Sequence, residues 1–154
     1  MPGNQLSPAV VGKGMRKFVA VLVVFAALLA GCGSGSSGAE VSGFVKLGPL
    51  TGKAPVPVEL TGDEGERLYR TLSEAAPADI EEAKAPLTAR RGDGVRAFAF
   101  VKPGCVETGA EVIVSVGTID VELTGGENTN CGQANYFLVV VRADDPEREL
   151  RLAG

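Results

Sequence analysis

The sequence predicts an α+β fold in which an antiparallel β-sheet carries one main helix on a face. Three observations lead to this prediction. Short segments rich in β-branched and aromatic residues dominate the second half of the chain, and one amphipathic helix precedes them. Two cysteines, Cys105 and Cys131, lie next to the two most apolar of these segments. A β-sandwich with a helical insertion is the alternative, because short strands of this kind also build two packed sheets.

The first 32 residues have the pattern of an export signal. Three basic residues at 13–17 precede an unbroken apolar run at 18–30, which ends in Leu29-Ala30-Gly31-Cys32. A run of this length fits the core of a signal peptide and is shorter than the roughly 20 residues that span a bilayer. The ending resembles the lipobox of bacterial lipoproteins, in which small residues precede a cysteine.

The resemblance implies that the protein is anchored to a membrane by lipid. In that family the chain is cut before the cysteine and its thiol is diacylated, so residues 1–31 are the expected signal peptide. Residues 32–40 then hold the acylated Cys32, with palmitate among the expected acyl groups, and a flexible Gly/Ser linker. Residues 41–154 form a single globular domain. The expected location is the extracytoplasmic face of the cell membrane, with the lipid bilayer as partner.

The charge balance excludes several classes of function. The chain has 15 Lys+Arg, 19 Asp+Glu and no His, which gives a formal net charge of -4. Removal of the signal peptide takes away only basic charges and leaves the rest more acidic, which argues against a nucleic-acid partner. Without His, a Ser-His-Asp triad is excluded and a zinc site is not expected. We therefore expect no metal and no cofactor.

One segment before the strands has the features of an amphipathic helix. Thr61 and Glu64 stand at the spacing of a capping box, which predicts a helix over 61–76. Four residues repeat at helical spacing and form its apolar stripe: Leu68, Tyr69, Leu72 and Ala76. Residues 79–84 are expected to add one or two helical turns that Pro86 stops, and Arg91-Gly92-Asp93 is expected to form a turn.

Two segments have the composition of central strands. Residues 95–102 place alanines on one face and Phe98 and Phe100 on the other, and residues 136–142 contain five consecutive apolar residues. Strands that are apolar on both faces are buried on both sides. Pro103-Gly104 is expected to turn the chain after the first of them.

The remaining strand candidates are weaker or half-buried. Val112, Val114 and Val116 share one face of their segment, while 118–124 alternates between apolar and polar residues. The prolines of 55–60 confine that segment to a sheet edge. These candidates occupy residues 41–47, 55–60, 111–116, 118–124 and 149–152.

The cysteines predict both a disulfide and a strand pairing. An exported chain meets a non-reducing environment, so Cys105 and Cys131 are expected to form a disulfide once Cys32 is acylated. A disulfide needs Cα atoms within roughly 4.4–6.8 Å. It therefore brings the end of 95–102 beside the start of 136–142. We expect these two strands to pair antiparallel at the centre of the sheet, with the main helix on one face.

The polar stretch 125–135 is the candidate binding surface. It is a loop held by the expected disulfide, and loops on rigid scaffolds commonly carry binding residues. The amides of Asn128, Asn130, Gln133 and Asn135 offer hydrogen-bond donors and acceptors for a polar ligand. The same residue types also form ordinary solvent-exposed turns, so both interpretations stay open.

Carboxylates are the plentiful reactive groups of this chain. Asp120 and Glu122 share one strand face about 7 Å apart by the rise of a strand, and Glu127 follows in the loop. Carboxylates at such distances hydrolyse glycosides or bind calcium. The competing interpretation is a solvated sheet face, since no calcium-loop pattern is present.

Together these features predict a non-catalytic binding or interaction module of the cell envelope. Its partner would be an envelope protein or a small polar ligand. A carboxylate-based hydrolase and a protease-inhibitor-like domain, whose braced loop resists cleavage, are the alternatives. Whether the chain is an enzyme stays open at this point.

Overall fold

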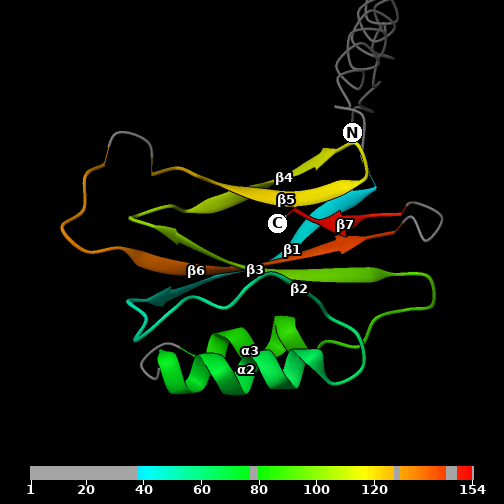
Figure 1. The fold of residues 1–154 in the computed structure, drawn as a ribbon, viewed down its shortest axis with the longest axis horizontal. Coiled ribbons are helices and arrows are strands. Elements are labelled where there is room, and N and C mark those ends of the chain that lie inside the picture. The colour runs from blue at the N-terminus through cyan, green and yellow to red at the C-terminus, as the bar shows by residue number, and fades with distance from the viewer. Residues whose placement is uncertain (1–37, 77–79, 127–128, 145–148, 154) are drawn as a thin grey trace, which may run out of the picture. The chain divides into compact units, whose positions relative to one another are not determined.

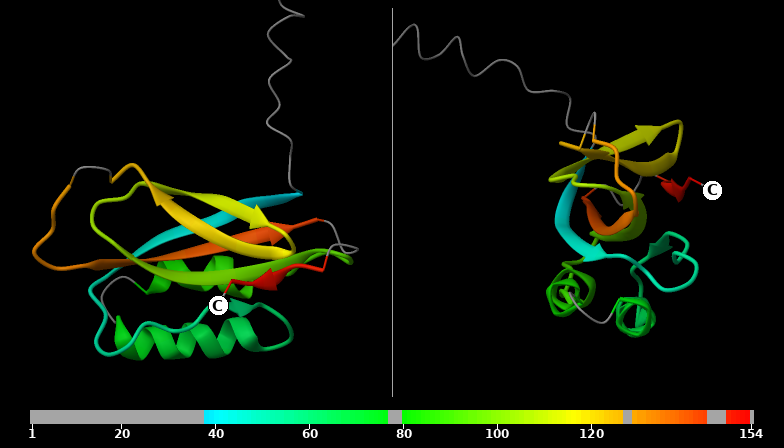
Figure 2. Two further views of the ribbon diagram at one scale, coloured as in Figure 1. Left: turned by 45° about the horizontal axis from the view of Figure 1, so that its top comes forward. Right: turned by 90° about the vertical axis from the view of Figure 1, so that its left-hand side faces the viewer.

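Two β-sheets and a pair of helices form three layers, which Figure 1 and Figure 2 show from different sides. In this computed structural model the described residues are 38–76, 80–126, 129–144 and 149–153. The expected signal peptide, Cys32 and most of the expected linker lie outside them. The fold is mainly β with antiparallel pairing, which confirms the coarse class predicted from the sequence.

The larger sheet, called sheet A, has four antiparallel strands in the order β1-β6-β3-β2. The strands are β1 (Ala39–Gly48), β2 (Val58–Glu59), β3 (Arg96–Gly104) and β6 (Asn135–Ala143). The predicted antiparallel pair is confirmed, since β3 and β6 are hydrogen-bonded along their length and occupy the centre. The proline-rich segment forms only the short edge strand β2, also as predicted.

The smaller sheet, called sheet B, contains β4 (Gly109–Ser115), β5 (Thr118–Thr124) and β7 (Arg151–Leu152). β4 and β5 form an antiparallel hairpin, and β7 pairs with β5 in parallel. Sheet B packs face to face on sheet A. Two packed sheets were the expectation of the alternative β-sandwich prediction. The helices cover the opposite face of sheet A, as Figure 2 shows.

Both faces of sheet A are buried, and the alternation of β3 decides which residue enters which core. Ala97 and Ala99 enter the core beneath the helices, while Phe98 and Phe100 enter the core between the sheets. Small residues leave room for the helices on one side, and large rings fill the space between the sheets on the other. The two-sided burial predicted for β3 and β6 is therefore confirmed.

In the described part of the chain two helices cover sheet A, so the expectation of one main helix is not confirmed. They are α2 (Glu64–Ala75) and α3 (Glu81–Thr88), and both contribute to the same core. Pro86 lies inside α3 and does not stop it. The ring packs on Gly43 of β1, where a Cβ would lie 2.6 Å from the Cβ of Pro86. Proline by itself destabilises a helix interior, and the packing of Pro86 on Gly43 offsets this cost.

The start of α2 also differs from the prediction. The helix begins at Glu64, and its N-cap Asp63 makes no side-chain capping hydrogen bond. The predicted capping box of Thr61 and Glu64 is therefore not formed. Gly62 has a φ of +53°, which turns the chain before the helix, and the Glu64 amide donates to the Thr61 carbonyl at 3.0 Å.

Strands β3 and β4 end at other residues than the sequence predicted. β3 continues through Pro103 and Gly104, which were expected to turn the chain. On the edge of β3 that faces β2, pairing involves only Phe98 and Ala99. Pro103, which has no N–H, therefore does not interrupt a hydrogen bond to β2. Val116 does not share the buried face of Val112 and Val114. It occupies a two-residue hairpin turn and is fully exposed, at 102 %.

The predicted disulfide between Cys105 and Cys131 is present, with Cα atoms 5.8 Å apart. It joins the segment after β3 to the segment before β6, where those strands already pair. β1 begins at Ala39, so the last two residues of the expected linker belong to a strand.

Candidate functional site

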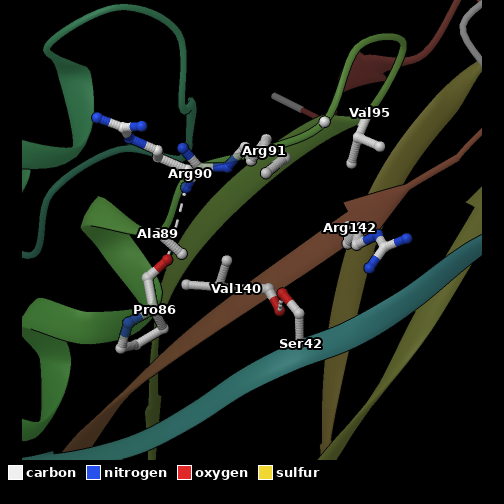
Figure 3. Close-up of a pocket in the computed structure, with 10 residues that line it drawn as sticks. Ser42, Pro86, Ala89, Arg90, Arg91, Val95, Val140 and Arg142 are labelled. Atoms are coloured by element: carbon white, nitrogen blue, oxygen red, sulfur yellow. Dashed lines mark hydrogen bonds between the residues drawn. The ribbon is translucent and has the colours of Figure 1, made fainter.

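A pocket of about 300 Å³ opens on the helix-covered face of sheet A, beside the C-terminal end of α3 (Figure 3). Its floor comes from β1, β3 and β6, and its wall from the end of α3 and the loop that leads to β3. Three arginines line it, namely Arg90, Arg91 and Arg142, and no described residue of the lining is an Asp or Glu. We call it the arginine pocket.

An irregularity in β1 shapes the floor of the arginine pocket. The register between β1 and β6 shifts between Val41 and Gly43, so Ser42 is an extra residue in the strand. Such a bulge re-aims a side chain relative to a regular strand. The Ser42 hydroxyl lines the pocket and donates to the Val140 carbonyl oxygen at 3.2 Å. The bulge therefore places a hydroxyl beside an otherwise apolar floor.

Arg91 is a half-buried cation that contacts carbonyl groups. Its Nη2 donates to the carbonyl oxygens of Leu87 at 3.1 Å and Pro86 at 3.5 Å, and Figure 3 shows the bond to Pro86. These contacts cap the end of α3, where unpaired carbonyls gather. Burial lowers the pKa of Arg91, but an arginine stays protonated at neutral pH. Among the described residues, no carboxylate pairs with this guanidinium.

The other two arginines lie at the rim. Arg142 pairs with Asp144 at 2.8 Å, and this hydrogen bond raises the pKa of Arg142. Arg90 is exposed, and Figure 3 shows its side chain extending away from Ser42. Within the described residues, its guanidinium has neither an ion pair nor a hydrogen bond.

A second hollow of about 480 Å³ lies on the other side of the loop, and Ala89, Arg90, Arg91, Gly92 and Val95 line both. It reaches the start of α2, where Glu66 contributes an acidic group. Its lining is therefore mixed in charge, unlike that of the arginine pocket.

A turn forms at Gly92–Val95, where the Val95 amide donates to the Gly92 carbonyl at 3.2 Å, so the turn predicted at Arg91-Gly92-Asp93 is confirmed for Gly92 and Asp93 while Arg91 precedes it. Arg91 folds back onto α3 while Asp93 is exposed.

The predicted binding loop has a different arrangement. Asn130 and Gln133 are exposed, whereas Asn128 lies outside the described residues. Asn135 begins β6, and its Nδ2 donates to the Cys105 carbonyl at 2.6 Å, so this amide braces the disulfide-linked strand ends. Of the described residues among them, Asn130, Gln133 and Asn135, none lines the arginine pocket or the neighbouring hollow.

Two of the candidate carboxylates, Asp120 and Glu122, lie on β5. Asp120 pairs with Lys102 at 2.7 Å, which links sheet B to sheet A. Glu122 lies opposite Glu111 in the β4–β5 hairpin, and both are exposed. Glu127 lies outside the described residues. Neither Asp120 nor Glu122 lines either hollow, so the hydrolase interpretation gains no support from the geometry.

The arginine pocket offers guanidinium groups and one hydroxyl among the described residues that line it. Among the described residues of the lining, Ser42 is the one hydroxyl, and none is a His, Lys, Asp or Glu that could act as a base. Guanidinium groups recognise oxyanions through paired N–H donors.

Comparisons of the chain with protein-family models, curated proteins and solved structures find no match. In the described part of the chain, no three His, Cys, Asp or Glu residues gather as metal ligands. No helix within the described ranges is long and apolar enough to cross a membrane.

The arginine pocket was not predicted from the sequence. The adjacent pair Arg90-Arg91 after a helical segment was the available signal. Ser42 and Arg142 are distant in the sequence, and only the pairing of β1 with β6 brings them to one hollow.

Proposed function

We propose that this protein is a lipid-anchored binding module on the extracytoplasmic face of the membrane, without catalytic activity, and that the arginine pocket is its binding site. One observation carries the proposal. A hollow of about 300 Å³ combines an apolar floor with three arginines, and no described residue that lines it is acidic, in a chain whose acidic residues outnumber its basic ones. Small-molecule sites typically combine apolar lining with a few polar groups that orient the ligand.

The expected anchor limits how far the module stands from the bilayer. β1 begins at Ala39, seven residues after Cys32. An extended chain spans about 3.3–3.6 Å per residue, so this linker reaches about 25 Å at most. Acylation of Cys32 would therefore hold the start of β1 within about 25 Å of the membrane surface.

Metabolic labelling with an alkyne-tagged palmitate tests the anchor in cells that express the full chain. We expect label on the wild-type protein and on Ser37→Ala, the matched control in the linker. The variant Cys32→Ser should lose both the label and sedimentation with membranes. Label that persists in Cys32→Ser would remove the lipoprotein part of the proposal.

Ligand-observed NMR with a set of charged and neutral fragments tests the binding site. The full lipidated chain is used in phosphatidylcholine nanodiscs, with empty nanodiscs subtracted. Val95→Phe places a larger side chain in the pocket wall, so it should suppress the fragment signals. Val106→Phe is the matched control, because Val106 is exposed beside the disulfide and does not line the pocket. Equal signals in both variants, or none in the wild type, would contradict the assignment.

A further inference from the structure

We propose that the arginine pocket takes a small organic carboxylate with a compact apolar body. This inference rests on the proposed function and names the ligand class of the same site. Four features carry it, namely an unneutralised half-buried cation, a limited positive charge, an apolar floor and a small volume.

The first feature is Arg91. Its guanidinium is half-buried, yet within the described residues its hydrogen bonds come from Nη2 and reach only the carbonyl oxygens of Pro86 and Leu87. A partly buried cation gains most from an anionic partner, because water screens the attraction less there. An oxyanion in the pocket would supply the negative charge that the described residues do not.

The second feature is the amount of charge. Asp144 already pairs with Arg142, and Glu40 lies opposite Arg142 in the β1–β6 register. The carbonyl end of α3 carries a partial negative charge beside Arg91. Asp93 lies in the turn between the pocket wall and β3. These negative groups offset part of the positive charge of the three arginines. The net positive charge left at the pocket matches a ligand with one negative charge better than one with two, which favours a carboxylate over a phosphate monoester.

The third feature is the floor. Val140 and Ala97 are buried in the core and present hydrocarbon to the pocket, and Pro86 and Val95 add apolar walls. An apolar group placed there removes hydrocarbon from water on both sides, which favours binding. A bare ion such as acetate would leave this part of the site unused.

The fourth feature is size. About 300 Å³ is at the lower limit of the pockets that hold small-molecule ligands, roughly 300–1,000 Å³. The volume accommodates a single ring or a short chain with its charged group.

Matched probes test the ligand class. Benzoate, its neutral isostere benzamide, acetate and phenyl phosphate are titrated against the full lipidated chain in phosphatidylcholine nanodiscs, with dissociation constants from saturation-transfer NMR. We expect benzoate to bind at least about tenfold more tightly than benzamide or acetate, the factor expected for loss of one charge-assisted contact or of the apolar contact. Benzoate binding should weaken as salt rises from 0.05 to 0.5 M, since salt screens the attraction.

Two variants locate the anion. Arg91→Gln retains a donor toward α3 but removes the charge, so it should weaken benzoate about tenfold and leave benzamide unchanged. Arg90→Gln should have a smaller effect in the same direction. It also serves if Arg91→Gln fails to fold, because Arg90 is exposed. Arg70→Gln, an exposed position on α2, is the control and should bind as the wild type.

The outcomes separate the two proposals. Benzamide binding as tightly as benzoate, with Val95→Phe abolishing both, would overturn the carboxylate and leave the binding module standing. Phenyl phosphate binding tenfold more tightly than benzoate would assign a dianion instead. Failure of every probe to show Val95-dependent binding would remove the carboxylate and the pocket assignment together.

Discussion

Gly65 of α2 lies directly against the carbonyl oxygen of Leu87 in α3. A Cβ on Gly65 would overlap that oxygen and would lie 3.0 Å from the Leu87 carbonyl carbon. The same oxygen accepts the hydrogen bond from Arg91. The close approach of the two helices therefore sets the position of the α3 end that supports the arginine pocket.

We expect Gly65→Ala to destabilise the protein by about 1–3 kcal/mol, the usual cost of overpacking. An alanine in an exposed helix interior would instead stabilise by about 1 kcal/mol, so the sign is diagnostic. Urea denaturation measures the change. Gly132→Ala is the control, since a Cβ there meets nothing within 4 Å. A neutral or stabilising Gly65→Ala would show that the helices do not approach so closely.

The β4–β5 turn holds a valine in an unfavourable backbone conformation. Val116 has a φ of 28° and Gly117 a φ of 78°, the signs that a two-residue hairpin turn requires. A β-branched residue rarely adopts a positive φ, whereas Asn does so readily. We expect Val116→Asn to stabilise by about 1 kcal/mol, measured as an increase in Tm. Val56→Asn, at another exposed valine, should change stability by less than about 0.5 kcal/mol.

The disulfide should contribute a large share of the stability. Its cysteines are 26 residues apart, and closing a loop of that length restricts the unfolded chain by about 3.5 kcal/mol. We expect the double variant Cys105→Ala/Cys131→Ala to lose about that much free energy of unfolding. Reduction of the wild type should give a similar loss and should not affect the double variant. A loss below about 1 kcal/mol would show that β3–β6 pairing alone orders this region.

The ion pair between Glu59 and Arg96 predicts a pH dependence. Arg96 donates through Nε and Nη2 at 2.8 and 2.9 Å, and this hydrogen bonding lowers the pKa of Glu59 below 4.5. A lowered folded-state pKa stabilises the protein above the unfolded value, and the contribution is lost as pH falls through the folded value.

We therefore expect Glu59→Gln to cost about 1 kcal/mol at pH 7 and progressively less below pH 4.5. Urea denaturation across this pH range gives the difference between wild type and variant. Glu74→Gln, an exposed position on α2, should change stability by less than about 0.5 kcal/mol. A cost for Glu59→Gln that stays constant down to pH 3 would contradict the assignment.

The strands and the central pair of sheet A could be predicted from the sequence, because the apolar pattern of a strand involves residues that are close in the chain. Apolar residues on both faces of β3 and β6 required burial on both sides, and the disulfide restricted their pairing to one arrangement. Pro86 and Thr61 misled the prediction. Their positions depend on contacts with Gly43 and on the backbone of Gly62, which local propensity does not report.

The sequence by itself determined the mainly β class, the central strand pair and the disulfide. Hydrophobic periodicity is a local pattern, and with Cys32 assigned to the lipid only Cys105 and Cys131 remained to pair. Only the tertiary structure decided that sheet B covers one face of sheet A and that two helices share the other. It also decided the arginine pocket. Ser42 and Arg142 meet Arg91 there because strand pairing joins residues about a hundred positions apart, and no local pattern encodes which surface groups become neighbours.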